Sequence, residues 1–410
     1  MFPDLEPARI LIALVVAFGV AALLVPLLNK PAARIGLLDH PNHRKQHEAP
    51  TPLTGGLALA LGAVAAFLVA FGGQWQPFWT LPLGAAVLLV VGLIDDIRPI
   101  SATLRFLVQI VVAAVMVYGG GLEVHVLGPI FGDAVGPVGL GPVSGVFTVA
   151  CMVFMINAVN MMDGLDGLSG GAAFVTFLLL FAVAALDGAP SGLQALPLLL
   201  AGATLGFLVW NLRRPFRPRA RAFLGDNGSM VLGYAMAWLA IALATREGAG
   251  VYPITIAWLL IIPAMDTLAL FVRRIRLGRS PFSADRAHLH HLLQRAGYRV
   301  STSVYMIHGL VLAAGLFGVL GWQQGWPPAL LFVLAAAVLI GYQVLLARAS
   351  SLLRWRHRRL RETAAANPAE HPPGRHPGRR RSGSQQVRMR HSSGHIGPRQ
   401  ARGTKRGGDA

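Results

Sequence analysis

The sequence predicts an all-α protein that crosses a membrane many times. Of its 410 residues, 54% are hydrophobic and only 13% are charged, whereas soluble domains average about 25% charged residues. The apolar residues fall into long runs, and many of these approach the roughly 20 residues that a helix needs to cross a bilayer. Basic residues gather in every second segment between the runs. These observations together exclude a soluble globular protein.

We expect about 11 transmembrane helices. The runs lie at approximately 8–28, 55–72, 80–94, 102–118, 143–159, 168–186, 194–210, 228–245, 254–272, 303–321 and 328–347. The first run lacks the basic start and the small-residue cleavage site of a signal peptide, so we expect it to remain as a span.

The basic residues also predict the orientation. One set of loops carries Lys30 to Lys45, Arg98 with Arg105, the Arg213–Arg221 run and a further run from Arg273 to Arg299, whereas the opposite set carries only Arg246. Short loops rich in Lys and Arg remain in the cytoplasm. The N-terminus is therefore expected outside (periplasmic) and the C-terminus in the cytoplasm, which an odd number of spans satisfies. All polar clusters described below then fall on the cytoplasmic face.

The chain divides into a multispan domain, residues 1–347, and a basic tail, residues 348–410. Much of the formal net charge of +18 comes from this tail, which is rich in Pro, Gly, Arg and Ser. Such a composition cannot form a core and predicts disorder. The tail could lie on anionic lipid, but nucleic-acid binding is not expected because aromatic residues do not alternate with the charges.

A polar stretch, Phe154 to Ser169, interrupts the middle of the apolar sequence. Its side chains include Asn157, Asn160, Asp163 and Asp166, spaced three apart, with Gly164 and Gly167 among them. On a regular helix this set would turn through about half a circle, so it converges only if the helix loosens at the glycines. Amide and carboxylate oxygens at a membrane-helix end indicate a hard cation beside a phosphate. The alternative is a polar helix cap.

Two further acidic motifs lie at predicted helix ends. Asp95 and Asp96 end the third run, where adjacent carboxylates repel each other and the helix dipole disfavours them, so a metal or cationic ligand is expected there. The alternative is a solvated turn before Pro99. The motif FLGDNGS, residues 223–229, precedes the eighth run, and its glycines would allow close approach of a ligand. Asp226 would repel a bare phosphate, so the motif implies a bridging cation; read alone, Asp226 could be a helix cap.

The basic clusters predict contacts with an anion. The segment SPFSADRAHLHH contains Arg286, His288, His290 and His291. His288 and His291, three apart, can share a helix face, whereas His288 and His290 cannot. No Cys or further His stands at zinc-ligand spacing, and a pyrophosphate suits the Arg and His donors better. Elsewhere, Arg44, Lys45 and His47 either meet an anionic substrate or only set topology, and we assign the Arg213–Arg221 run to topology.

Acids and amides on one face opposite Arg and His predict a Mg²⁺-dependent phosphoryl transfer. The four motifs, PNHRKQHEAPTPLTGG with LIDD, NAVNMMDGLDGL, FLGDNGS and SPFSADRAHLHH, appear in this order over about residues 10–345. In this arrangement the chain resembles the polyprenyl-phosphate N-acetylhexosamine-1-phosphate transferase family. DRAHLHH is similar to the Arg-x-x-His-x-His-His signature of the GlcNAc-1-phosphate branch. The muramoyl-pentapeptide branch has three consecutive histidines and ten spans.

The resemblance implies a reaction between UDP-GlcNAc and undecaprenyl phosphate that releases UMP and starts a lipid-linked cell-envelope glycan at the bacterial inner membrane. It implies Mg²⁺, with Mn²⁺ as a substitute, held by Asp226 with Asn160. It gives catalytic roles to Asp95, Asp96, Asp163 and Asp166, with Asp95 handling the lipid phosphate. The substrate-binding set is Asn157, Phe223 (stacking on uracil), Arg286, His288, His290 and His291, together with Arg44, Lys45 and His47. A nucleotide role for Asn211 is doubtful because an Arg- and Pro-rich loop follows it.

Several alternatives stay open at this point. The enzyme could be a phospho-N-acetylmuramoyl-pentapeptide transferase or use another UDP-amino sugar. A cation-coupled secondary transporter is a distant alternative, since it predicts acids near the middle of spans and an internal repeat. The sequence does not choose the envelope glycan or the oligomeric state, and a homodimer is compatible with it.

Overall fold

The computed structural model describes residues 3–40, 50–74, 76–280 and 287–366. The chain divides into two units, Met1–Trp355 and Arg356–Ala410. Among the described residues the regular structure is helical except for two short strands, β1 (Leu38–Asp39) and β2 (Thr51–Pro52). The prediction of an all-α, polytopic membrane protein is confirmed at this level.

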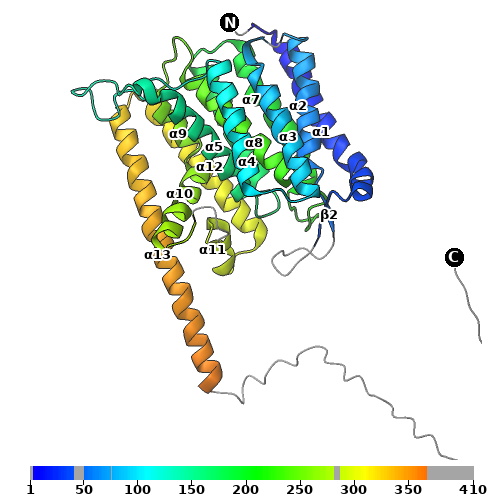
Figure 1. Ribbon diagram of the computed structural model, residues 1–410, viewed down its shortest axis with the longest axis vertical. Helices are drawn as coiled ribbons and strands as arrows, with labels where there is room; N and C mark the ends of the chain where they lie inside the picture. The colour runs from blue at the N-terminus through cyan, green and yellow to red at the C-terminus, as the bar shows by residue number, and fades with distance from the viewer. Residues whose placement is uncertain (1–2, 41–49, 75, 281–286, 367–410) are drawn as a thin grey trace, which may run out of the picture. The chain divides into compact units, whose positions relative to one another are not determined.

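The helices form an up-and-down bundle (Figure 1). In chain order they are α1 (Pro7–Ile35), α2 (Gly55–Phe71), α3 (Thr80–Ile97), α4 (Ala102–Ala114), α5 (Ser144–Met162), α6 (Leu168–Leu186), α7 (Ser191–Asn211), α8 (Gly225–Ala244), α9 (Pro253–Leu259), α10 (Ile261–Arg276), α11 (Leu289–Arg295), α12 (Val300–Gln323) and α13 (Pro328–Ala366). In the described part of the chain, 9 helical segments are long and apolar enough to cross a membrane, and α2 is apolar but has 17 residues.

The expected span 254–272 is not one straight helix, and this part of the prediction is wrong. The chain breaks at Leu260 into α9 and α10, which are bent by 83° relative to each other. Pro263 follows the break; its ring cannot donate to the preceding turn, which helps to interrupt the helical hydrogen bonds. Counted as one span, the bent pair brings the described candidates to 10.

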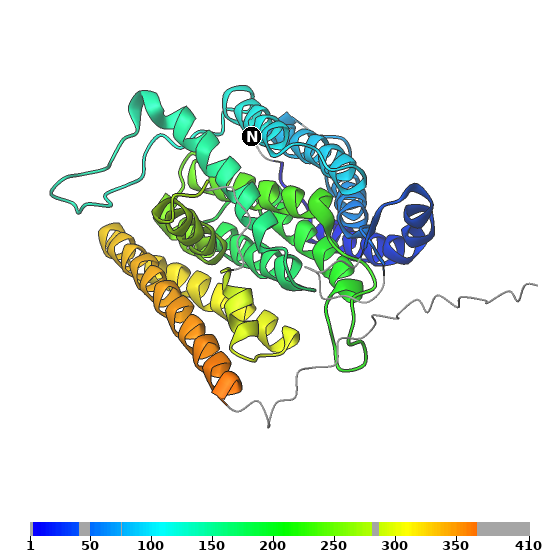
Figure 2. The ribbon, with the colours of Figure 1, turned by 60° about the horizontal axis from the view of Figure 1, so that its bottom comes forward.

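Helix α8 is the centre of the bundle. It packs against α2, α3, α5 and α6, and 94% of its most apolar 18-residue stretch is buried. Two large side chains fix it to the start of α3: Tyr234 donates to the carbonyl of Thr80 at 2.6 Å, and Trp238 donates to the Thr80 hydroxyl at 2.9 Å. Around this centre, α1 and α12 lie on opposite sides of the bundle (Figure 2).

The connections at the lower end in Figure 1 position the site. Strands β1 and β2 pair antiparallel, with Asp39 opposite Thr51. The backbone of Phe223 joins this hairpin, because its N–H donates to Pro52 and its carbonyl accepts from Gly55. The segments before α2 and before α8 are therefore tied together.

Two other segments bear on the sequence predictions. The loop between α4 and α5 forms a short hairpin, with a bridge between Val126 and Gly139. At the other end of the chain, α13 continues to Ala366, so residues 348–366, expected to belong to the tail, are helical. The rest of that predicted tail lies outside the described residues.

Candidate active site

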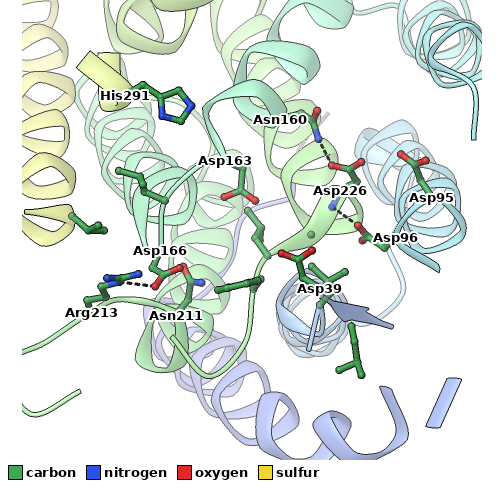
Figure 3. Close-up of a pocket in the computed structure, with 18 of the residues that line it drawn as sticks. Asp39, Asp95, Asp96, Asn160, Asp163, Asp166, Asn211, Arg213, Asp226 and His291 are labelled. Atoms are coloured by element: carbon green, nitrogen blue, oxygen red, sulfur yellow. Dashed lines mark hydrogen bonds and ion pairs between the residues drawn. The ribbon is translucent and has the colours of Figure 1, made fainter. Parts of the chain in front are cut away.

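A cavity of about 550 Å³ opens where α3 and α5 end and α8 begins. Six carboxylates line it: Asp39, Asp95, Asp96, Asp163, Asp166 and Asp226 (Figure 3). They come from four separate parts of the chain, and the cationic or titratable basic side chains among the lining residues are Arg213 and His291. The acids predicted from the three motifs therefore do converge.

Asp95 and Asp96 face different partners. The buried Asp95 accepts from the backbone N–H of Ile100 at 2.7 Å and from the guanidinium of Arg105 at 2.6 Å. Asp96 accepts from the backbone N–H groups of Asp226 at 3.0 Å and Asn227 at 3.1 Å. The first N–H groups of a helix lack intrahelical acceptors, so Asp96 supplies a cap for α8 from another helix. Protein groups, not only a metal, thus account for this acidic pair.

Asp226 lies at the first turn of α8 and connects both acidic motifs. Its Oδ1 accepts from the Asn160 side-chain amide at 2.8 Å, and its Oδ2 accepts from Arg105 at 3.0 Å. The Asn160 amide also donates to Ser229 at 2.9 Å. Arg105 therefore bridges Asp95 and Asp226, and Asn160 lies beside Asp226 as predicted.

The stretch from Asn157 to Asp166 loosens as expected, but only three of its four polar residues reach the cavity. Helix α5 ends at Met162, and Gly167 has φ 82°, a left-handed conformation that glycine adopts without strain. Asn160, Asp163 and Asp166 line the cavity. Asn157 instead donates to Gln109 at 2.6 Å and lines a neighbouring apolar groove.

Asp163 differs from the other acids of the cavity. No hydrogen bond or ion pair to its carboxylate is found among the described residues. Burial, and then the nearby carboxylates of Asp226 and Asp96, raise the pKa of Asp163 well above its usual range. A carboxylate in this position is stabilised by a proton or by an added cation.

Asp166 is held by an arginine that we had assigned to topology. Arg213 donates to Asp166 at 2.6 Å, so this part of the Arg-rich loop belongs to the cavity. The nearby Asn211 links two backbone segments: it accepts from the Gly167 N–H at 2.7 Å and donates to the Ala222 carbonyl at 2.8 Å. Both residues fix the loop that follows α5.

The glycines of FLGDNGS have two different roles. Gly225 lines the cavity with φ 75°, and a Cβ there would lie 2.6 Å from the Asp96 carboxylate. Gly228 packs on the backbone of Gly56, to which a Cβ would approach within 2.6 Å. The expectation that both glycines admit a ligand is therefore wrong for Gly228, which serves helix packing. Phe223 lines the cavity, where a stacking role stays a prediction.

The three histidines are arranged differently from the helix-face prediction. Helix α11 begins at Leu289, so His288 precedes it and the helical spacing rule does not apply. The rings of His288 and His290 are stacked, 5.5 Å apart and 13° from parallel. His291 lines the cavity, whereas His288 and His290 are 6% and 2% exposed. Burial lowers the pKa of His290 to about 3, helped by His291 and His288, so its ring is neutral.

Four predicted substrate-binding residues, Arg44, Lys45, His47 and Arg286, lie outside the described residues. The structure also adds residues that the sequence analysis did not assign to the site, namely Asp39, Arg105 and Arg213. For Arg105 a signal was available, because a lone arginine inside the apolar run 102–118 is costly and calls for a partner. Asp39 had no such signal, since it lies in a polar loop.

The donor set suits a hard divalent cation. Asp163, Asp226 and Asn160 line the cavity and carry side-chain oxygens, and oxygen is the ligand that Mg²⁺ prefers. Within the described ranges, no three His, Cys, Asp or Glu side chains are grouped closely enough to hold an ion by themselves. Mg²⁺ usually takes one or two carboxylates and completes its shell with water and substrate phosphates. The residues present fit that mode.

The fold and the cavity define a polytopic membrane protein with an acidic site at one end of its helix bundle. A family model described as glycosyl transferase family 4 matches residues 78–244. Similar proteins include the undecaprenyl-phosphate alpha-N-acetylglucosaminyl 1-phosphate transferases of Yersinia pestis (34% identity over 79% of this chain and 88% of the relative) and Haemophilus influenzae (34%, 73% and 84%). The relative of the same name in Escherichia coli K12 is 34% identical over 83% of this chain and 92% of its own length. The chain belongs to glycosyl transferase family 4.

Proposed function

We propose that this protein transfers N-acetylglucosamine 1-phosphate from UDP-GlcNAc to undecaprenyl phosphate and releases UMP. The similarity to relatives that carry the name of this activity supports the proposal. So does the convergence of Asp163, Asp226 and Asn160 on one cavity at the end of the bundle, which is the observation that carries it. A phosphate of a lipid headgroup and a soluble nucleotide sugar can meet only at such a boundary between membrane and water.

An apolar groove provides a place for the lipid chain. It has a volume of about 540 Å³ and lies between α4, α5 and Phe271 of α10. Its lining runs from Tyr118 to Asn157, and Asn157 stands one helical turn before Asn160 of the acidic cavity. A polyprenyl chain in this groove would bring its phosphate to the acids.

The proposed reaction forms a bond between a lipid-phosphate oxygen and the β-phosphorus of the donor. The bond from that phosphorus to the oxygen bridging to UMP breaks, and UMP leaves with the electron pair, while the bond between C1 of the sugar and its oxygen is kept. Arg213 and His291, which line the cavity, are positioned to hold phosphate oxygens. Mg²⁺ bound through Asp226, Asn160 and Asp163 would neutralise charge on the diphosphate.

The carboxylates divide into two groups in this scheme. Asp95 and Asp96 are already engaged by Arg105, Ile100 and the start of α8, so they support the geometry of the site. For Asp95 to handle the lipid phosphate, one of its bonds would have to open. Asp163 needs no such change, because it has no hydrogen-bond partner among the described residues. We therefore assign the first contact with substrates or metal to Asp163, whereas Asp226, which accepts from Asn160 and Arg105, would join it after one of these bonds opens.

We further propose eleven spans in a bacterial inner membrane, with the N-terminus periplasmic and the cavity cytoplasmic. The count takes α2 as a span and the α9–α10 pair as one. Fusions test it: green fluorescent protein at the C-terminus should fluoresce, and alkaline phosphatase placed between α6 and α7 should be active. The reverse pattern would contradict this orientation.

The substrate is tested with purified protein, undecaprenyl phosphate and a panel of UDP-sugars. UMP release should be fastest with UDP-GlcNAc. Turnover of UDP-MurNAc-pentapeptide alone would assign the protein to the muramoyl-pentapeptide branch, and preference for another UDP-amino sugar would change the donor but not the reaction. Absence of UMP release with every donor would overturn the proposed function.

A further inference from the structure

A second carboxylate site lies away from the cavity, at Asp266 on α10. Asp266 is only 5% exposed, and it lies shortly after the break between α9 and α10. An ionisable group inside a membrane protein is costly and calls for a partner and a role. The proposed reaction does not use it directly.

Three donors meet on this carboxylate. Its Oδ2 lies 2.8 Å from Nδ1 of His288. Its Oδ1 accepts from the backbone N–H of Leu289 at 3.0 Å and from the hydroxyl of Tyr342 at 2.5 Å. Two of the three donors belong to the start of the histidine segment (His288 to His291), and the third belongs to α13. Asp266 thus joins α10, the histidine segment and α13.

The contact fixes the orientation of a ring. An ionised carboxylate can only accept hydrogen bonds, so Nδ1 of His288 carries a hydrogen and donates it to Asp266. The ring of His288 stacks on that of His290, whose centroid lies 4.2 Å from that of His291. His291 in turn lines the cavity. The three rings form a continuous connection from Asp266 to the cavity wall.

We propose that Asp266 is a positioning residue that holds the histidine segment, through His288, in the orientation needed to bind the diphosphate of the donor. Tyr342 supports the same carboxylate from α13. The identity of the donor in this inference rests on the proposed function, whereas the placement of the histidines does not. A carboxylate behind a functional histidine fixes its tautomer and orientation in the same way in metal sites.

The kinetic test compares Asp266→Asn with wild type in the UMP-release assay. Removal of the charge weakens the hold on His288, so kcat/KM for UDP-GlcNAc should fall by about 10- to 100-fold. Most of this loss should come from a higher KM for UDP-GlcNAc, and KM for undecaprenyl phosphate should stay unchanged. Tyr342→Phe removes one donor and should raise the same KM by a smaller factor. Leu346→Ala, at a buried position of α13 in the same apolar cluster, is the matched control: it should lower thermal stability and leave both KM values unchanged.

A double variant separates positioning from simple destabilisation. If Asp266 acts through His288, Asp266→Asn combined with His288→Gln should be no worse than the more impaired single variant, because the two residues act as one unit. Independent, multiplicative losses would overturn the inference. If Asp266→Asn fails to fold, the KM for UDP-GlcNAc in Tyr342→Phe decides, and an unchanged value would count against it.

A chemical readout makes the test independent of turnover. Diethyl pyrocarbonate labels accessible histidines, and mass spectrometry of the 287–295 peptide locates the label. His288 should be protected in wild type and labelled several-fold faster in Asp266→Asn. If labelling follows this pattern but wild type releases no UMP, the proposed function fails and the positioning role stands. If wild type is active and neither KM nor labelling changes in the variant, the positioning role is wrong.

Discussion

Asp96 accepts a hydrogen bond from the backbone N–H of Asp226 at 3.0 Å, although 130 positions of sequence separate the two residues. The acid at the end of α3 therefore holds the first turn of α8 in place. This contact fixes the position of Asp226 relative to Asp95 and Asp163, so the geometry of the cavity depends on a bond between two helices rather than on any one motif.

Asp226→Asn should remove most turnover while the protein still inserts and folds. The amide keeps the size of the side chain but loses the charge that would bind Mg²⁺ and that pairs with Arg105. We expect UMP release to fall by at least about 100-fold, in the range that loss of a charge-stabilising group causes. Asp133→Asn, at an exposed acid on the far loop, is the control. Near-normal Mg²⁺-dependent activity in Asp226→Asn would show that the assignment is wrong.

Arg105→Gln should make the stability of the protein depend on Mg²⁺. Arg105 is the cation between Asp95 and Asp226. Without it these acids face each other uncompensated, at a cost of about 1–3 kcal/mol. Thermal unfolding in detergent should show a lower midpoint in EDTA, and Mg²⁺ should raise the midpoint more than in wild type. The exposed Arg98→Gln is the matched control, and an equal Mg²⁺ response in all three proteins would contradict this role.

Gly164→Ala should displace the histidine segment. A Cβ at this position would lie 2.4 Å from Nε2 of His290, a distance that forces the ring to move. Because small displacements of binding groups are costly in catalysis, UMP release should fall by about 10- to 100-fold. Gly309→Ala, with no atom within 4 Å of the new Cβ, should leave the rate unchanged. Equal rates for the two variants would mean that the packing of His290 against Gly164 does not matter.

Stability should decrease at acid pH in a way that depends on His290. Burial lowers the pKa of the folded His290 ring to about 3, from the ordinary histidine value of about 6.5. Below pH 6.5 the His290 ring binds a proton in the unfolded chain but stays neutral in the folded protein. Its contribution to the free energy of unfolding is therefore complete above pH 6.5 and is lost as the pH falls towards 3. At pH 5 the loss amounts to ~2 kcal/mol. Thermal unfolding of wild type between pH 7 and 5 should therefore shift more than that of His290→Gln. Parallel shifts would contradict a neutral, buried His290.

Much of the fold could be predicted from the sequence because lipid requires apolar surface and internally bonded backbone along every span. The runs 168–186 and 194–210 match α6 and α7 for this reason. The break at Leu260 could not be predicted in the same way, since the two helices on either side of it are together apolar enough to pass as one span. Hydropathy reports the composition of a segment and not its direction.

The convergence on the cavity was predictable where a polar motif marks the end of an apolar run, as for Asn160, Asp163 and Asp226. It was not predictable where the partner comes from elsewhere. Arg213 counts as a topological charge in a sequence, and the position of Arg105 in an apolar run indicates a partner without identifying it. Only the packing of α4 and of the loop after α7 shows that both face acids. The spacing argument for His288 failed because it placed this residue inside a helix, whereas α11 begins one residue later, at Leu289.

The enclosure of α8 by four neighbouring helices limits where the molecule can rearrange during turnover. A helix that is buried on every side cannot shift without disrupting the core around it. We therefore expect α8 to stay in place during turnover and to keep Asp226 in a fixed position. The movements that admit a donor and release UMP should then occur in the outer helices, namely the broken pair α9–α10 and the short helix α11. In hydrogen–deuterium exchange, α8 with Asp226 should therefore exchange slowly, and the segment that carries the histidines should exchange fast.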